Sequence, residues 1–241
     1  MIQVNDYLLV IKSNKIVSKG KDTLIFFNLE SKKEMDIKIN GNYSFVYTVN
    51  GLAVMPIERK RKREENDNIY PHKVLLCACK KYLKSQKNGI LLVNIKENNY
   101  NKIEISSNFY PTFNFEVYCI CPLLKMQKGN LFKDVEIFDT DYFLAGGFDL
   151  DRYRGMIKLY KVNFGIEYDQ TTIEYIQDII FDNYDFKGFK GAVSCITQSS
   201  KEGDILVSCW DGNVYLFGNL NIDYYLENNN QDELIEYLTK K

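Results

Sequence analysis

The sequence has few of the residues on which enzymes most often build an active site. It contains a single histidine, His72, in 241 residues, so a Ser-His-Asp or Cys-His arrangement would depend on that one side chain. His72 follows Pro71 at the end of a charged segment, which is typical of a solvated loop residue. No glycine-rich phosphate loop of Walker or dinucleotide spacing is present. We therefore expect a non-catalytic chain without a cofactor.

Long apolar runs and an excess of one charge are also missing. The 31 Lys and Arg residues nearly balance 32 Asp and Glu residues, so no long-range field attracts nucleic acid or an anionic membrane. The longest apolar runs, such as 74–79, are too short to cross a bilayer, and the beginning of the sequence lacks the pattern of a secretion signal. We expect an intracellular chain, nuclear or cytoplasmic, that does not enter a membrane.

Four of the six cysteines form two Cys-x-Cys pairs, Cys77/Cys79 and Cys119/Cys121. Residues i and i+2 of a strand share a face, so each pair is predicted to point to one side of a sheet. Structural zinc favours Cys-x2-Cys spacing, and a fold held by disulfides does not fit the missing export signal. Buried, reduced thiols are the prediction, with metal ligands and disulfides as the alternatives.

Short apolar or alternating runs bounded by Gly, Asn, Asp and Lys recur along the chain, and helical periodicity is scarce before residue 219. Such runs predict strands. Without crossover helices the strands must pair mostly antiparallel, which makes the chain all-β. The predicted strands are 7–11, 23–29, 35–39, 45–49, 52–57, 74–79, 90–95, 102–105, 115–121, 142–147, 156–162, 172–179, 192–197, 205–210 and 214–217.

Several of these runs repeat one another. The segment Leu76-Cys77-Ala78-Cys79 aligns with Leu144-Ala145-Gly146-Gly147 and with Leu206-Val207-Ser208-Cys209, and a turn ending in Gly and a further strand follow each. The segment 7–29 is a weaker copy of this hairpin, and the polar stretches 58–71 and 125–141 are interpreted as inserted loops. The unit of strand, link, hairpin and outer strand is typical of a propeller blade, with a two-sheet sandwich as the alternative.

The last repeat, 188–217, resembles a blade of the WD-repeat family. Phe189 stands where that family has His, Phe217 where it has Trp and Gly218 where it has the final Asp, so apolar packing must replace the family's hydrogen-bond network. The resemblance implies a WD-repeat-type β-propeller over residues 1–218, with about three to four blades, followed by a short helical tail over 219–241. These blades either form part of a longer propeller, which we favour, or close a small or irregular ring. The matching residues are Gly188, Val193, Ile196, Gly203, Leu206, Ser208, Asp211, Gly212 and Val214.

Ser208, Asp211 and Gly212 are interpreted as turn residues of this blade. An Asp-Gly pair between two apolar runs favours a two-residue hairpin turn whose central residues have positive φ. A fainter similarity, in 142–147, 154–157 and 190–193, is to the last propeller of the large subunits of the cleavage and polyadenylation and damaged-DNA-binding complexes. That similarity implies a nuclear scaffold.

The tip of the second repeated hairpin contains Asp149, Asp151, Arg152, Tyr153 and Arg154. Rigid blades hold such rim loops in fixed positions, where their side chains can contact a partner, so these five residues are the candidate interaction loop. Two carboxylates without the rest of a calcium-loop pattern do not indicate a metal.

A run of five basic residues, Arg59, Lys60, Arg61, Lys62 and Arg63, lies between acidic neighbours. It is a candidate nuclear import signal, or else only a solvated loop. The sequence thus predicts a scaffold for protein–protein interaction within an intracellular complex. The alternative is a nuclear subunit of an RNA-processing or DNA-damage complex that binds nucleic acid or its processing factors. The oligomeric state stays open.

Overall fold

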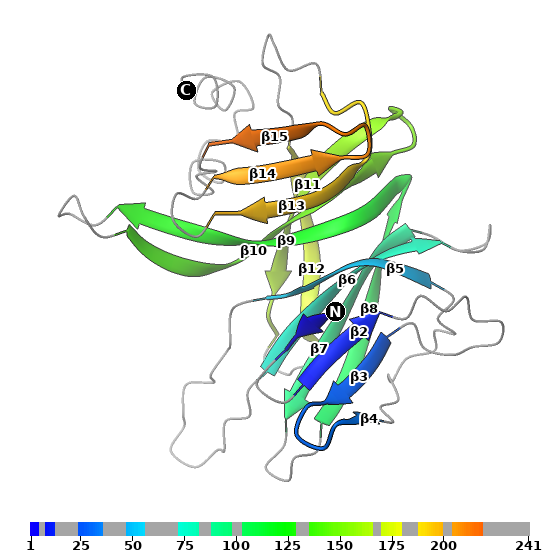
Figure 1. Cartoon of the computed structure of the whole chain (residues 1–241), viewed down its shortest axis with the longest axis vertical. Coiled ribbons are helices and arrows are strands. Elements are labelled where there is room, and N and C mark those ends of the chain that lie inside the picture. Colours follow the sequence, from blue (N-terminus) through cyan, green and yellow to red (C-terminus); the bar gives the residue numbers. More distant parts are fainter. Residues whose placement is uncertain are drawn as a thin grey trace.

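The computed structural model describes residues 1–4, 8–12, 24–35, 47–55, 72–81, 88–97, 103–128, 135–165, 170–179, 188–199 and 204–218. In this part of the chain, 15 strands form four antiparallel sheets, which confirms the all-β class (Figure 1). Sheet I contains β1 (Ile2–Gln3), β2 (Leu8–Lys12), β3 (Leu24–Asn28) and β4 (Lys33–Met35). Sheet II contains β5 (Tyr47–Val54), β6 (His72–Lys81), β7 (Asn88–Glu97) and β8 (Ile103–Phe113). Sheet III contains β9 (Phe115–Lys128), β10 (Val135–Asp149), β11 (Arg154–Asn163) and β12 (Thr172–Ile179), and sheet IV contains β13 (Val193–Gln198), β14 (Ile205–Cys209) and β15 (Val214–Phe217).

Within each sheet the strands lie in chain order, and each pairs antiparallel with the next. Hairpins need only short connections, so this meander is the simplest arrangement for a chain without crossover helices. Each sheet is therefore built from one continuous stretch of sequence.

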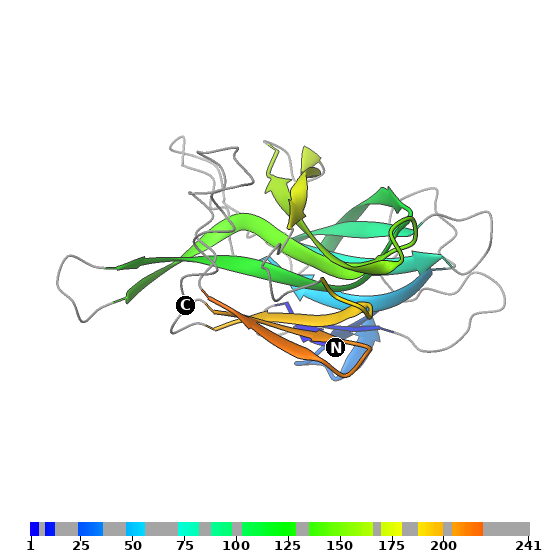
Figure 2. The ribbon, with the colours of Figure 1, turned by 90° about the horizontal axis from the view of Figure 1, so that it is seen from above.

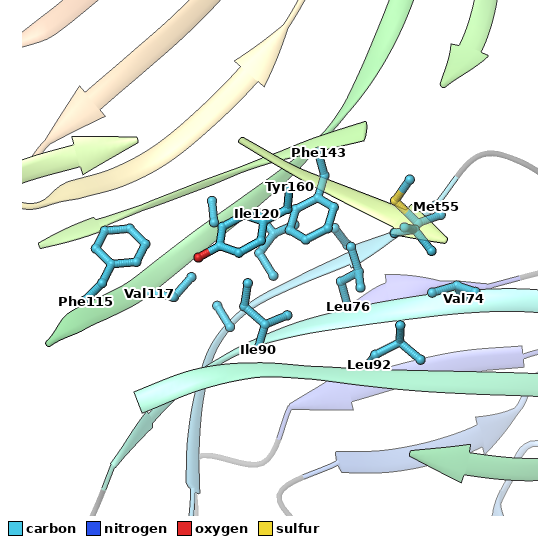
Figure 3. Close-up of a cluster of buried hydrophobic side chains, with 14 of the residues drawn as sticks. Met55, Val74, Leu76, Ile90, Leu92, Phe115, Val117, Ile120, Phe143 and Tyr160 are labelled. Atoms are coloured by element: carbon cyan, nitrogen blue, oxygen red, sulfur yellow. The ribbon is translucent and has the colours of Figure 1, made fainter. Parts of the chain in front are cut away.

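Apolar side chains join the four sheets face to face, again in chain order. One cluster lies between sheets I and II, a second between II and III, and a third between III and IV, as far as the chain is described. Figure 3 shows the second cluster, in which Leu76, Ile90 and Leu92 of sheet II approach Phe143 and Tyr160 of sheet III. Sheets II and III are thus covered on both faces. This double burial explains why their strands have continuous apolar runs rather than alternation.

The repeated segments occupy equivalent positions in successive sheets. Each forms the second strand of its sheet, and its leucine is opposite another leucine in the third strand. The Cα partners are Leu76 and Leu92 in sheet II, Leu144 and Leu159 in sheet III, and Leu206 and Leu216 in sheet IV. Two residues further along the second strand, Ala78, Gly146 and Ser208 are opposite Ile90, Ile157 and Val214. The segments that align in sequence therefore occupy equivalent structural positions in the three sheets.

Two features of the strands differ from the prediction. The interpretation of 125–141 as a loop is wrong in large part, because β9 runs to Lys128 and β10 begins at Val135, so that the two strands continue pairing beyond the sheet (Figure 1). Backbone pairing from Asp139 to Val135 holds this arm, which the sequence prediction treated as a polar loop. Sheet I also has four strands where the sequence predicted one hairpin and a separate strand.

A third difference concerns the segment that was predicted as two strands, 45–49 and 52–57. The structure has one strand, β5, with a register shift between Val49 and Gly51. Asn50 Nδ2 donates a hydrogen bond to the carbonyl of Val117 in sheet III at 3.1 Å. A Cβ on Gly51 would lie 2.9 Å from the carbonyl oxygen of Tyr118. The Asn-Gly pair therefore makes a bulge that brings sheet III close, rather than a turn.

The Cys-x-Cys pairs lie as predicted, each on one face of a sheet. Cys77 and Cys79 pack against sheet I, and Cys119 and Cys121 pack against sheet IV. Burial raises the pKa of the Cys79 thiol to about 12 and that of the Cys121 thiol to about 11. All six cysteines belong to the described residues and are free thiols, and Cys195 is exposed.

Some predictions fall on residues that the structure does not describe. The basic run from Arg59 to Arg63 and the predicted tail, 219–241, are among them. The backbone of His72 begins β6, but its side chain is outside the description as well.

Candidate interaction surface

Three connections meet at one edge of sheets III and IV. They are Asn114 with Phe113 at the end of β8, residues 149–154 at the hairpin of β10 and β11, and residues 210–213 between β14 and β15. The amide of Leu150 donates to the carbonyl of Asn114 at 2.8 Å, and the rings of Tyr118 and Trp210 lie 4.4 Å apart between centroids. Figure 1 shows the last two connections at the right-hand end of the upper sheets. We call these three connections the rim.

The predicted interaction loop is a rigid turn within the rim. Oδ1 of Asp149 accepts the backbone N–H groups of Asp151 at 2.9 Å and of Arg152 at 3.0 Å. Both carboxylate oxygens of Asp151 accept from Asn114 Nδ2, at 2.9 and 3.0 Å. Asp149 is buried, so its carboxylate shapes the turn instead of facing solvent. Arg154 is half-buried at the start of β11, which leaves Asp151, Arg152 and Tyr153 as the exposed members of the loop.

Arg152 joins the loop to the outer strand of sheet III. Its Nη1 lies 2.9 Å from Oδ2 of Asp178, and the Tyr175 hydroxyl donates to Oδ1 of the same carboxylate at 2.8 Å. Nζ of Lys158 lies 3.3 Å from Asp178 Oδ1. Burial by itself would raise the pKa of Asp178, but the hydrogen bonds from Tyr175 and Arg152 and the charge of Lys158 outweigh it and lower that pKa. Burial and the hydrogen bond to Asp178 raise the pKa of Tyr175 to about 12.

Removing the Arg152 guanidinium is expected to raise the pKa of Asp178. A carboxylate whose pKa is lower in the folded state stabilises the fold above its unfolded pKa, and this stabilisation is lost as pH falls through the folded pKa. The variant Arg152→Ala should therefore unfold in acid at a higher pH than the wild type. Carboxyl NMR titration measures the pKa of Asp178, and circular dichroism measures the acid transition.

Arg154→Ala is the matched control for that experiment, because it removes the same charge from the same hairpin but outside the group around Asp178. It should leave the pKa of Asp178 unchanged. Equal shifts of the Asp178 pKa in both variants would mean that general charge, and not the 2.9 Å contact, sets it.

Three large side chains are exposed on the rim: Phe113, Tyr153 and Trp210, with exposed fractions of 66%, 79% and 64%. Phe113 and Tyr153 both have a φ of 50°. Residues other than glycine avoid this left-handed region, and a bulky side chain there is uncommon. Two aromatic side chains are therefore held in solvent by strained backbone, at a cost of about 1 kcal/mol or more each.

The turn between β14 and β15 differs from the predicted two-residue turn. Within this turn only Gly212 has positive φ, at 84°, and four residues, 210–213, separate the strands. The amide of Cys209 donates to the carbonyl of Asn213 at 3.0 Å. Asp211 Oδ1 accepts the amide of Asn213 at 3.1 Å. Ser208 lies in β14, outside the turn, so its interpretation as a turn residue is corrected. Its hydroxyl lies 3.0 Å from that of Ser194 in β13.

Sequence reasoning missed Phe113, Asn114 and Trp210. The short segment Phe113-Asn114-Phe115 carries a turn signal, an Asn between apolar residues, but it lies in a gap between two predicted strands. Trp210 was assigned to the end of a strand. Nothing in a single sequence separates an exposed aromatic residue from one that packs within a sheet.

The rim carries no sign of a metal centre, since nowhere in the described ranges do three His, Cys, Asp or Glu side chains gather as ligands would. Within the same ranges no helix is long and apolar enough to cross a bilayer. Comparison with protein families, with curated proteins and with solved structures finds no match for this chain.

Proposed function

We propose that this chain is a non-catalytic scaffold of the WD-repeat propeller type, which binds a protein partner through the rim within an intracellular complex. Four meandering sheets stacked in chain order support the architecture, because blades of a propeller are arranged in this way. Phe189 and Phe217 depart from the WD-repeat pattern, and their packing is the apolar substitute expected at these two positions. Their rings meet nearly perpendicular with centroids 6.1 Å apart, where that family has a polar His and Trp network.

The observation that carries the proposal is the group of exposed aromatic side chains on the rim. Aromatic residues and arginine are the commonest energetic anchors of protein interfaces. Here Arg152 lies on the same turn as Tyr153, and its guanidinium is held by Asp178. Because Phe113 and Tyr153 are displayed at a cost in backbone strain, a binding role explains their position better than solvation does.

The charges of the rim favour a protein over nucleic acid as the partner. The rim contains Asp149, Asp151 and Asp211 together with Arg152 and Arg154, so it has mixed charge. Binding to a phosphate backbone requires a predominantly basic surface. The second candidate, a nuclear subunit that binds nucleic acid or its processing factors, is favoured only by the basic run from Arg59 to Arg63.

The double variant Phe113→Gly/Tyr153→Gly tests the proposal. Glycine adopts positive φ without strain, so the variant should be at least as stable as the wild type, while it loses two interface anchors. Affinity purification with quantitative mass spectrometry should recover a protein with the wild type and lose most of it with the variant. Interface anchors contribute about 2 kcal/mol or more each, so the loss of affinity should exceed tenfold.

Lys32→Gly is the matched control, since Lys32 also has positive φ, at 54°, but lies in the turn between β3 and β4 of sheet I. It should retain the partner. A partner bound equally by the wild type and both variants would show that the aromatic side chains of the rim do not bind it. Recovery of RNA with the wild type, lost in a variant with Arg59 to Arg63 replaced by Ser, would support the second candidate instead.

A further inference from the structure

The outer face of sheet IV is apolar and exposed. Leu206, Val214 and Leu216 have exposed fractions of 42%, 62% and 68%. The Cα partners of Leu206 are Leu216 on one side and Thr197 on the other, and the exposed Cys195 is the Cα partner of Ser208 in the next row. These residues form the face opposite to Ile205 and Val207, which pack on sheet III. We call Cys195, Thr197, Leu206, Val214 and Leu216 the open face.

The same positions are buried wherever another sheet follows in the stack. Leu76 and Leu92 of sheet II are fully buried against sheet III. Leu144 and Leu159 of sheet III are buried against sheet IV. Leu206 and Leu216 repeat these leucine pairs, and Val214 repeats Ile90 and Ile157. The open face therefore has the residues of a sheet that another sheet covers.

Sheet I, at the other end of the stack, has one face on which no other described sheet packs. Leu24 and Phe26 of β3 pack on sheet II, so the half-buried Ile25 and Phe27 point to the opposite side. Their Cα partners in β2 are Ile11 and Leu9, and the Cα partner of Phe27 in β4 is the exposed Glu34. By sequence this face is therefore apolar apart from one carboxylate on the edge strand. In the stack, every later sheet packs with its corresponding face on the sheet before it.

The two terminal sheets, I and IV, lie on the same side of the molecule. Figure 2 shows sheets I (blue) and IV (orange) on one side of the molecule, with sheets II and III on the other. Each terminal sheet packs on an inner sheet, so both uncovered faces point away from the inner pair. The exposure of Leu206 and Leu216 shows that sheet I of the same chain does not cover them.

We propose that the open face of sheet IV docks against sheet I of a second copy of this chain, and that two such junctions close a ring of two copies. Two copies of a four-sheet stack supply eight sheets, which is within the range of roughly 4 to 8 blades with which propellers close. The contact is between two different faces, as in head-to-tail assemblies, and the twofold repetition of the junction closes the ring. This inference uses the stack and not the rim, so it stands or fails separately from partner binding.

Analytical ultracentrifugation of the wild type should give a mass of twice 28.2 kDa. The double variants Leu206→Asp/Leu216→Asp and Ile25→Asp/Phe27→Asp should each sediment as monomers, with circular dichroism to establish that they are folded. Thr172→Asp is the control, since Thr172 is exposed at the start of β12, which belongs to neither sheet I nor sheet IV, and this variant should remain a dimer.

Mixing the two double variants tests the pairing itself. Each keeps one intact face, so one junction can form between an intact sheet IV and an intact sheet I. The mixture should therefore contain dimers that neither variant forms alone. Dimers formed by either variant alone would overturn the proposal, because they would require contacts between two identical sheets.

Cys195 provides a measurement on the wild type that needs no variant. Among the cysteines it is the exposed one, and it lies on the open face, so its rate of reaction with Ellman's reagent should fall as protein concentration rises and dimers form. A monomeric wild type at every concentration would overturn the proposal. A monomer with Cys195 protected throughout would mean that another segment of the same chain covers the open face.

Discussion

Replacing Leu144 with alanine is expected to lower the free energy of unfolding by about 2 to 5 kcal/mol. Leu144 is fully buried between sheets III and IV, where it lies in a cluster with Ile157, Leu159 and Val193. The sheets on either side are held by other contacts and cannot collapse fully into the space that the side chain leaves, so a cavity adds to the lost burial. Urea denaturation followed by circular dichroism measures the change.

Leu206→Ala is the control that makes this experiment a test of the repeat. Leu206 has the same position in its sheet and the same leucine partner across the strand pair, but no sheet lies over it in the single chain. At concentrations where the protein is monomeric, its replacement should cost less than about 1 kcal/mol. Similar losses from both variants would contradict the assignment of these leucines to equivalent positions with different cover.

The parts of the fold that the sequence predicts well are those in which packing determines the residues. The strand from Val74 to Cys79 is buried on both faces and therefore reads as a continuous apolar run. Val214 to Phe217 matches the predicted bounds because Asn213 and Gly218 limit it on both sides, and Thr172 to Ile179 also matches its predicted bounds. The internal repeat also follows from packing, since equivalent positions in the stack require similar side chains.

The sequence does not predict the strand segments whose extent is set by backbone pairing with a neighbouring strand. The arm of β9 and β10 is held by strand pairing from Asp139 to Val135, and β8 continues through Pro111 to Phe113. A strand held mainly by backbone pairing needs no regular apolar pattern. Its extent depends on its neighbour, which a single sequence does not reveal.

The sequence predicts only part of the candidate site, because the rest depends on contacts between sheets that a single sequence does not reveal. The loop from Asp149 to Arg154 could be found because its residues are those of a turn between two clear strands. The roles within it could not be assigned, because Asp149 turns inward to accept two backbone N–H groups while Tyr153 is exposed. The contribution of Phe113 and Trp210 depends on sheets II, III and IV meeting at one edge, which is a property of the stack.

Gly147→Ala is expected to destabilise the protein by about 1 to 3 kcal/mol and to change the environment of Trp210. A Cβ at Gly147 would lie 1.8 Å from the carbonyl oxygen of Glu116, a backbone atom of the paired strand that cannot move without shifting β9. The pairing of β9 with β10 has a register shift at this point, between Gly146 and Gly147. The bulge places Tyr118 under Trp210, so a shift of β9 should separate the two rings.

The fluorescence of Trp210 reports this effect without interference, because it is the only tryptophan in the sequence. The matched control is Gly218→Ala, at a glycine with no heavy atom within 4 Å of an added Cβ. That variant should change stability by no more than about 0.5 kcal/mol and leave the emission spectrum unaltered. Destabilisation by Gly147→Ala with an unchanged Trp210 spectrum would show that the bulge serves packing alone. A change in both would mean that the small residues of the second strand, which let the sheets approach, also set the geometry of the surface through which the protein is proposed to bind.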